Sequence, residues 1–182
     1  FTVGGLSPST TYEFRVKDSC SATDVSNWSV GAQAMTDCGP VASPWVENFD
    51  GPNWVVPADH WAYGGIDTCW SRPAAANYWW RPNSGPTPTG LTAIGTGPSA
   101  DHTSGTGKYM HGEAQNGTGV ALLRSPNVLL AGLLNPELRF YYHQFGPQID
   151  SLVVKIFRNG TETRMWGNSQ QTSAATAPWS EA

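Results

Sequence analysis

The sequence has little charge and no concentration of charge of one sign. Charged residues make up 13% of the 182 residues, and 10 basic against 14 acidic residues give a formal net charge of −4. Because Lys and Arg form no cluster, the composition argues against a nucleic-acid interface or a patch that binds anionic membranes. The apolar runs also fall short of the ~20 residues that a membrane-spanning helix needs.

Signatures of catalysis and of zinc binding are also missing. The sequence contains no CxxC pair, no HExxH motif and no GxSxG motif, which argues against a structural zinc site and against the common hydrolase families. We interpret His102 as hydrogen-bonded within its own loop, and His111 with Glu113 as a polar pair on one strand face. The four histidines, none at metal-ligand spacing, are His60, His102, His111 and His143.

Turn-forming and aromatic residues are abundant. There are 20 glycines, 14 prolines and 9 tryptophans, a composition typical of a loop-rich all-β protein. Apolar and polar residues alternate over 12–17, as in a half-buried strand. Asn-Gly pairs at 116–117 and 159–160 suit hairpin turns, and the second predicts a hairpin between SLVVKIFR and TETRMW. Further strands are predicted over residues 28–36, 45–50, 66–71, 77–81, 108–115, 120–130, 137–145 and 151–158.

Three cysteines bear on covalent cross-links. Cys20 and Cys38 flank a segment that can fold back as a hairpin, so we predict a disulfide between them, as in many secreted β modules. Cys69 then has no obvious partner, and we interpret it as a buried thiol that packs like a small apolar residue.

The first 38 residues resemble the end of a known module. The string GLSPSTTYEFRVKDSCSATDVSNWS is similar to the C-terminal part of a fibronectin type III domain, in which Leu6 and Tyr12 would lie at a corner between sheets. With a further strand predicted in FTVGGL at 1–6, this piece has three strands, which do not close a sandwich, so it is expected to pack on something else or to be mobile. GPVASP, at 39–44, is predicted to be a short linker.

The remaining chain resembles the MAM domain, named for meprin, neuropilin and a receptor tyrosine phosphatase. The motifs occur in the family's order: TGPSADHTSGTGKYMHGEA at 96–114, ALLRSP at 121–126, ELRFYYHQFG at 137–146, DSLVVKIFRNGTETRMWGN at 150–168 and APWSEA at 177–182. The resemblance implies a jelly-roll-like β-sandwich over 45–182 that lacks the family's final strands. It also implies a non-catalytic, extracellular adhesion or ligand-binding module.

The same resemblance implies a cation site. In MAM domains an acidic residue of the first strand and the Asp of the loop motif are tied together by calcium or sodium, and these positions match Asp50 and Asp101. Glu47 is a candidate third oxygen donor. The alternative is that Asp101 caps its own turn while Asp50 begins the Asp50-Gly51 turn.

A run of aromatic residues offers a second candidate site. If Trp79 or Trp80 were exposed beside Arg81, the rings could stack on a sugar; the alternative is that loops cover the rings.

The resemblance to MAM domains leads us to expect a module of a secreted or cell-surface multidomain protein that binds a protein or glycan. The alternatives are a carbohydrate-binding appendage of a polysaccharide-degrading enzyme and an accessory module of a secreted metallopeptidase.

Overall fold

The chain folds as an all-β protein. The computed structural model describes residues 2–59, 62–73, 78–87, 97–112, 119–146 and 149–182. These residues contain ten strands and no helix, so none of their segments is a helix able to cross a bilayer. The predicted fold class is confirmed.

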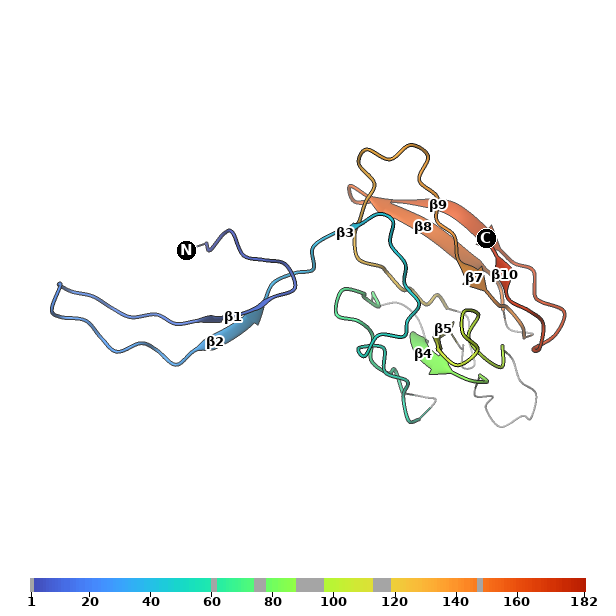
Figure 1. Ribbon diagram of the computed structural model, residues 1–182, viewed down its shortest axis with the longest axis horizontal. Coiled ribbons are helices and arrows are strands. Elements are labelled where there is room, and N and C mark those ends of the chain that lie inside the picture. The colour runs from blue at the N-terminus through green and yellow to red at the C-terminus, as the bar shows by residue number, and fades with distance from the viewer. Residues whose placement is uncertain (1, 60–61, 74–77, 88–96, 113–118, 147–148) are drawn as a thin grey trace.

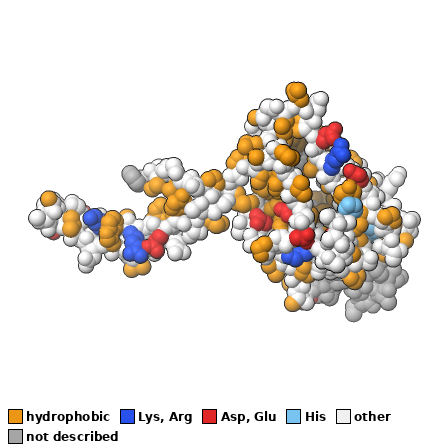
Figure 2. Space-filling view, in the orientation of Figure 1, with side chains coloured by type: hydrophobic (Ala, Val, Ile, Leu, Met, Phe, Trp, Pro, Cys, Tyr) orange, Lys and Arg blue, Asp and Glu red, His pale blue; other side chains and the backbone are white. Residues whose placement is uncertain are grey.

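A two-stranded hairpin projects from the rest of the molecule (Figure 1). It pairs β1 (Thr11–Phe14) with β2 (Ala32–Met35) in antiparallel register. Its apolar side chains stay open to solvent: Val30 is 94% exposed and Trp28 is 58% exposed. Figure 2 shows hydrophobic side chains along this projection. The hairpin therefore has no closed core of its own, as expected for a fragment of a sandwich, and its fibronectin type III assignment stays a prediction.

The other strands form the body in two layers. β7 (Tyr141–Tyr142) pairs with β10 (Ser180–Glu181), and β8 (Leu152–Arg158) pairs with β9 (Thr161–Asn168). These four strands lie on one side of the body in Figure 1, and β4 (Trp80–Ser84) and β5 (Lys108–Gly112), an antiparallel pair, lie on the other. The arrangement is that of a β-sandwich.

The segment predicted to be a linker also contributes a strand to the body. β3 (Val41–Ala42) runs parallel to β6 (Val128–Leu129), and the amide of Val41 donates to the carbonyl of Asn127 at 2.8 Å. The connection from the hairpin is therefore held against the body rather than free in solvent.

The predicted opening strand at 45–50 is wrong. The carboxylate of Glu47 accepts from the amide of Phe49 at 2.7 Å, and the side chain of Asn48 accepts from the amide of Asp50 at 3.1 Å. Each side chain bonds the backbone two residues ahead, which favours a turn over a ladder. Phe49 accordingly has a φ of 63°. Residues 66–71 are likewise not a strand, since only Ser71 forms an isolated bridge.

The strongest local prediction, a hairpin that joins SLVVKIFR (151–158) to TETRMW (161–166), is confirmed. Asn159 and Gly160 connect β8 to β9 with φ values of 51° and 80°. Both values are positive, as a primed two-residue turn requires. The other Asn-Gly pair, at 116–117, lies outside the described residues.

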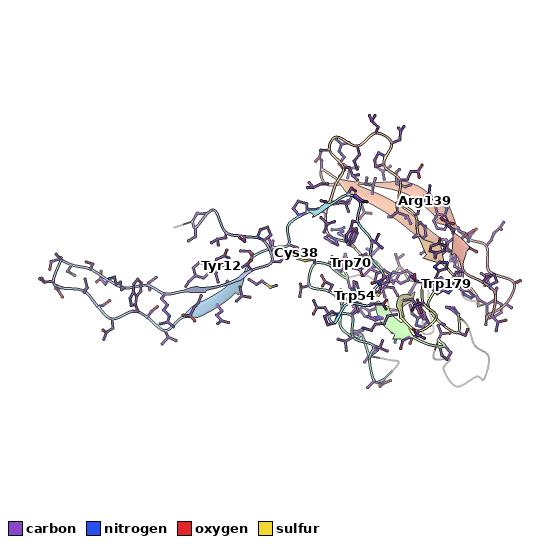
Figure 3. The ribbon with its side chains drawn as sticks, viewed as in Figure 1. Tyr12, Cys38, Trp54, Trp70, Arg139 and Trp179 are labelled. Carbon is purple, nitrogen blue, oxygen red and sulfur yellow. A yellow bond between two sulfur atoms is a disulfide. The ribbon has the colours of Figure 1, made fainter. Side chains whose placement is uncertain are left out.

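Aromatic rings fill the body. Trp54, only 2% exposed, meets Phe49 and Trp70 edge to face, with ring centroids 5.0 and 5.4 Å apart. Figure 3 places Trp54 and Trp70 inside the body. A second group places Phe140 and Tyr142 against Trp166, at 5.1 and 5.0 Å. Such rings bury large apolar areas in preferred geometries, so most of the tryptophans serve packing.

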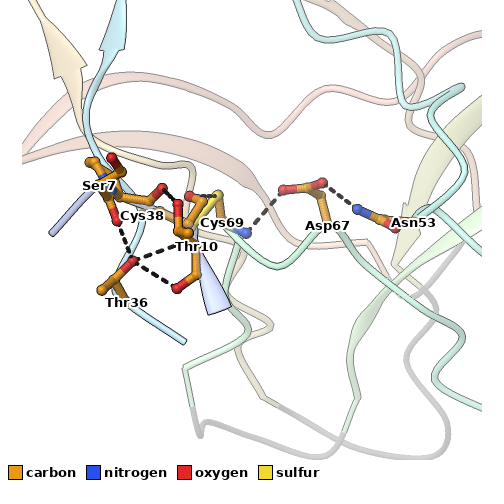
Figure 4. The surroundings of a disulfide bond; sticks show 9 residues. Ser7, Thr10, Thr36, Cys38, Asn53, Asp67 and Cys69 are labelled. Carbon is orange, nitrogen blue, oxygen red and sulfur yellow. Dashed lines mark hydrogen bonds between the residues drawn. A yellow bond between two sulfur atoms is a disulfide. The ribbon is translucent and has the colours of Figure 1, made fainter. Parts of the chain in front are cut away.

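The disulfide joins Cys38 to Cys69, so the predicted Cys20–Cys38 pair is wrong, and so is the interpretation of Cys69 as a free thiol. Cys20 is an exposed free thiol in a turn closed by the amide of Ser26 donating to the carbonyl of Asp18. Cys38 instead lies where the hairpin meets the body (Figure 4). The amide of Cys69 donates to the carboxylate of Asp67 at 2.9 Å. The bridge thus ties the N-terminal hairpin to the body.

The Cys38→Ser/Cys69→Ser double variant is expected to lose roughly 3–4 kcal/mol in free energy of unfolding. The bridge closes a loop across a sequence separation of 31, and a cross-link of that span stabilises the fold by about this amount because it lowers the entropy of the unfolded chain. Urea denaturation measures the change. Cys20→Ser is the matched control and should leave the midpoint unchanged. Endoproteinase Asp-N separates the three cysteines, so non-reducing mass spectrometry should recover the Cys38 fragment linked to the Cys69 fragment. Recovery of a Cys20–Cys38 link would refute the assignment.

Candidate functional site

The loop over residues 97–107 is organised around one carboxylate. Asp101 is buried, with 8% of its surface exposed. Its Oδ2 accepts from the amides of Thr103 and Ser104 at 2.9 and 2.8 Å, and its Oδ1 accepts from the amide of Gly107 at 2.7 Å. The hydroxyl of Ser104 lies 3.2 Å from both oxygens. The side chain therefore satisfies donors along the whole second half of the loop.

The ionised form of Asp101 is the stable one in the folded protein. Burial by itself would raise the pKa of this carboxyl group, but the hydrogen bonds from Ser104, Gly107 and Thr103 outweigh burial and lower the pKa below its ordinary value of 3.8. Hydrogen bonds of this kind favour the charged form of a carboxylate. The loop is thus built around a fixed negative charge.

The carboxylate of Asp50, in the opening segment of the body, lies beside the loop that Asp101 organises. Its Oδ1 accepts from the amide of Lys108 at 2.8 Å. A Cβ atom added to Gly107 would lie 2.7 Å from that oxygen, while the Gly107 amide donates to Asp101. Two carboxylates distant in sequence therefore lie beside one glycine, which must lack a side chain to admit them.

A cation of the chain itself lies beside Asp50. The ammonium nitrogen of Lys108 is 3.4 Å from the carbonyl oxygen of Asp50 and 3.3 Å from that of Gly51. Carboxylate and carbonyl oxygens are the ligands that a hard cation such as calcium prefers, so the oxygen atoms at Asp50 and Gly51 have the chemistry that suits a cation. Glu47 is not brought into this group by any described contact, because its carboxylate bonds the amide of Phe49.

The loop is also fixed to strands of both layers. His102 stacks on Tyr141 of β7, with centroids 3.4 Å apart and planes 10° from parallel, rather than bonding within its loop as we expected. The indole N–H of Trp179 donates to the carbonyl of Ala100 at 3.1 Å, and its ring meets Tyr109 of β5 edge to face. These contacts leave the loop little freedom to rearrange.

The aromatic residues predicted as a sugar platform are half-buried and engaged in packing. The indole N–H of Trp80 donates to the carbonyl of Ala121 at 3.1 Å, and Trp79 meets Tyr63 edge to face at 5.2 Å. Arg81, in contrast, is buried, with 7% exposed. Glycan binding at these rings stays a prediction.

A basic cluster was not predicted from the sequence. Arg81 of β4 pairs across the sheet with His111 of β5, and the charge of Arg81 acts on Arg72. Burial first, and then Arg81, lower the pKa of His111 to about 4, so His111 is neutral at pH 7. Glu113, predicted to pair with it, lies outside the described residues. The available signal was an arginine that directly follows two tryptophans, since aromatic residues favour half-buried strand positions.

Asp101→Asn is expected to reduce the free energy of unfolding by about 2–3 kcal/mol near neutral pH, because an amide cannot accept all of these hydrogen bonds and the lost ones involve a charge. Since the folded pKa of Asp101 is lowered, its contribution is complete above the ordinary value of 3.8 and is lost as the pH falls below it. Urea denaturation at pH 6 and pH 3 should show a large difference from wild type at pH 6 and a small one at pH 3. Asp150→Asn, at an exposed position, is the control. An equal difference at both pH values would contradict this role.

Comparison with known proteins agrees with this architecture. The family model described as "MAM domain, meprin/A5/mu" matches residues 64–182, more than half of the chain. Thyroid hormone-induced protein B of Xenopus laevis is 34% identical over 115 residues, which cover 60% of this chain and 15% of that protein. No solved structure matches the chain. MAM domains are non-catalytic modules that mediate extracellular protein interactions, and the disulfide agrees with an extracellular protein. The match over residues 64–182 therefore makes this chain a member of the MAM domain family.

Proposed function

We propose that this chain is an adhesion or ligand-binding module of a secreted or cell-surface multidomain protein, and that its ligand is an extracellular protein. The observation that carries the proposal is the family match over residues 64–182. The structure of the loop supports it: the buried acid Asp101 accepts bonds from its own loop, so it serves as a structural anchor rather than as an acid or base facing a substrate.

The parent protein is proposed to be considerably longer than this chain. The chain spans 15% of the length of the Xenopus laevis relative. A hairpin with open apolar side chains precedes the MAM domain, which is the arrangement expected if residues 1–38 end a fibronectin type III domain. Because function depends on surfaces carried by the fold, the activity of the parent protein follows from its other domains as well.

We also propose that a calcium or sodium ion binds at Asp50. The Asp50 carboxylate and the carbonyls of Asp50 and Gly51 would supply oxygen ligands, and Asp101 would keep the loop in place beside them. Bound there, the ion would supply positive charge that links the opening segment to the loop. The ammonium group of Lys108 lies at the same carbonyls, so it competes with the ion by like-charge repulsion.

Calcium at 5 mM is expected to raise the melting temperature by about 2–8 °C over a chelated sample, from the ~10⁻⁴–10⁻³ M affinities of extracellular sites and the mass-action stabilisation they produce. Asp50→Asn should abolish the shift, and Lys108→Met should enlarge it by removing the competing charge. Asp150→Asn should retain the wild-type shift. Equal midpoints with calcium and with chelator would refute the ion proposal without affecting the family assignment.

The class of ligand can be tested directly. We expect the full chain, applied in solution and detected through a C-terminal tag, to bind at least one member of an array of extracellular protein domains and to give no signal above background on a glycan array. Isothermal titration calorimetry would confirm the hit in solution at physiological salt. Selective binding to polysaccharides, weakened by Trp79→Ala, would support the carbohydrate-binding alternative instead.

A further inference from the structure

The β8–β9 hairpin carries a net positive charge, although the chain as a whole is negative. From residue 151 to residue 168, Glu162 is the only acidic residue, and Lys155, Arg158 and Arg164 are basic. The register places Lys155 opposite Arg164. It also places Phe157, two residues along β8, opposite Glu162. Residues opposite each other, or two apart on one strand, share a face of a sheet. One face of this hairpin, which lies along the side of the body in Figure 1, therefore gathers two cations, one carboxylate and one phenyl ring.

The single carboxylate on this face is divided between two cations. Glu162 Oε2 lies 3.1 Å from the ammonium nitrogen of Lys155, and its Oε1 lies 3.4 Å from Nη2 of Arg124, a residue of the segment before β6. The side chains of Arg124 and Lys155 stay 45% and 48% exposed. Exposed ion pairs of this kind stabilise a fold very little. Three cations, counting Arg164, thus accompany one acid, and we define these four residues together with Phe157 as the β8–β9 face.

The third cation, Arg164, has a defined position but no acidic partner. No Asp or Glu among the described residues forms an ion pair with it. A Cβ atom added to Gly167 would lie 2.8 Å from Cζ of Arg164, so the guanidinium group lies over the backbone at Gly167, where the missing side chain makes room for it. Its cross-strand neighbour is Lys155, and like charges directly opposite each other destabilise a sheet. A carboxylate bound at Arg164 would relieve this repulsion and form charge-assisted hydrogen bonds with the guanidinium group.

An apolar group lies among these charges. Phe157 is 50% exposed, and the guanidinium carbon of Arg124 lies 4.6 Å from the centre of its ring. Aromatic and arginine side chains are enriched at the centres of protein interfaces, because a ring buries a large apolar area and a guanidinium group is weakly hydrated. The ring of Phe157 therefore offers a partner an apolar surface directly beside the cations.

The mixed composition of the β8–β9 face selects among anionic partners. A polyanion such as a sulfated glycan carries closely spaced charges, and the carboxylate of Glu162 would repel them. A protein segment with one carboxylate next to an apolar side chain would place the acid at Arg164 and the apolar group on Phe157. Complementarity of charge and of apolar surface therefore favours a protein partner.

We propose that the β8–β9 face docks an acidic segment of the protein ligand, with a Glu or Asp carboxylate at Arg164 and Lys155 and an apolar neighbour on Phe157. The inference rests on the proposed function, since it assumes a protein ligand. The Asn159-Gly160 turn closes the hairpin, so the face is preorganised and binding has little chain to order. Because salt screens exposed charges, the interaction weakens as the salt concentration rises.

The test uses the peptide acetyl-Gly-Leu-Glu-Leu-Gly-amide as the probe and its Gln analogue as the neutral control. In an amide NMR titration of the full chain at low salt, the Glu peptide is expected to shift the resonances of Lys155, Phe157 and Arg164, and the Gln analogue is not. Arg164→Thr should weaken binding about fivefold, and Arg164→Lys, which keeps the charge, should stay within about threefold of wild type. Arg158→Thr removes an exposed arginine from the opposite face of the same hairpin and should bind as wild type.

A stability measurement separates recognition from a structural role. Since Lys155 opposes Arg164 across the strands, Arg164→Thr should leave the melting temperature unchanged or raise it by up to about 3 °C while it weakens binding. A residue that serves only the fold would lower both quantities when it is replaced. A melting temperature that fell in step with the affinity would therefore make Arg164 structural and overturn the proposal.

Other outcomes would also overturn it. Equal shifts with the Glu and Gln peptides would exclude carboxylate recognition, and shifts confined to other residues would place the binding elsewhere. Binding of heparin that is lost in Arg164→Thr, without binding of the Glu peptide, would identify a sulfated glycan as the occupant. A protein ligand found by the array that bound Arg164→Thr and Lys155→Thr as tightly as wild type would refute the β8–β9 face while leaving the proposed function intact.

Discussion

The body of this protein depends on the hydrogen bonds that converge on the carboxylate of Asp101. Three backbone amides, from Thr103, Ser104 and Gly107, donate to it, and together they give a glycine-rich loop one conformation. The loop in turn positions Gly107 beside Asp50 and presents His102 to Tyr141. The opening segment and both layers of the sandwich therefore meet at a loop whose shape is set by one buried charge.

The buried polar groups of the body differ in how far the described residues satisfy them. The Asp101 carboxylate is saturated by its own loop, whereas Arg72 retains buried donors that the described residues do not satisfy. The first kind of group stabilises the domain wherever it occurs. The second kind costs stability unless a polar partner beyond the described residues compensates it.

The parts of the fold that were predictable from the sequence rest on local chemistry. Asn159-Gly160 specifies its turn through φ values that only a few residues adopt readily, and the spacing of Asp101 from Gly107 indicates a loop closed on itself. The opening segment was missed because Glu47 and Asn48 bond the backbone two residues ahead, which alternation cannot reveal. The Cys38–Cys69 bridge and the Arg72–Arg81 pair depend on which distant segments meet in space, and no local pattern in one sequence encodes that.

The Cys38–Cys69 bridge has a mechanical consequence for a module within a longer polypeptide. Tension applied through the N-terminal hairpin reaches Cys38 and can pass through the sulfur atoms directly to Cys69. The intervening segment, which includes Trp45 and Trp54 of the aromatic core, is then bypassed and carries no load. Pulling would therefore extend the hairpin before it loads the segment between the two cysteines, because the bridge transmits the force past that segment.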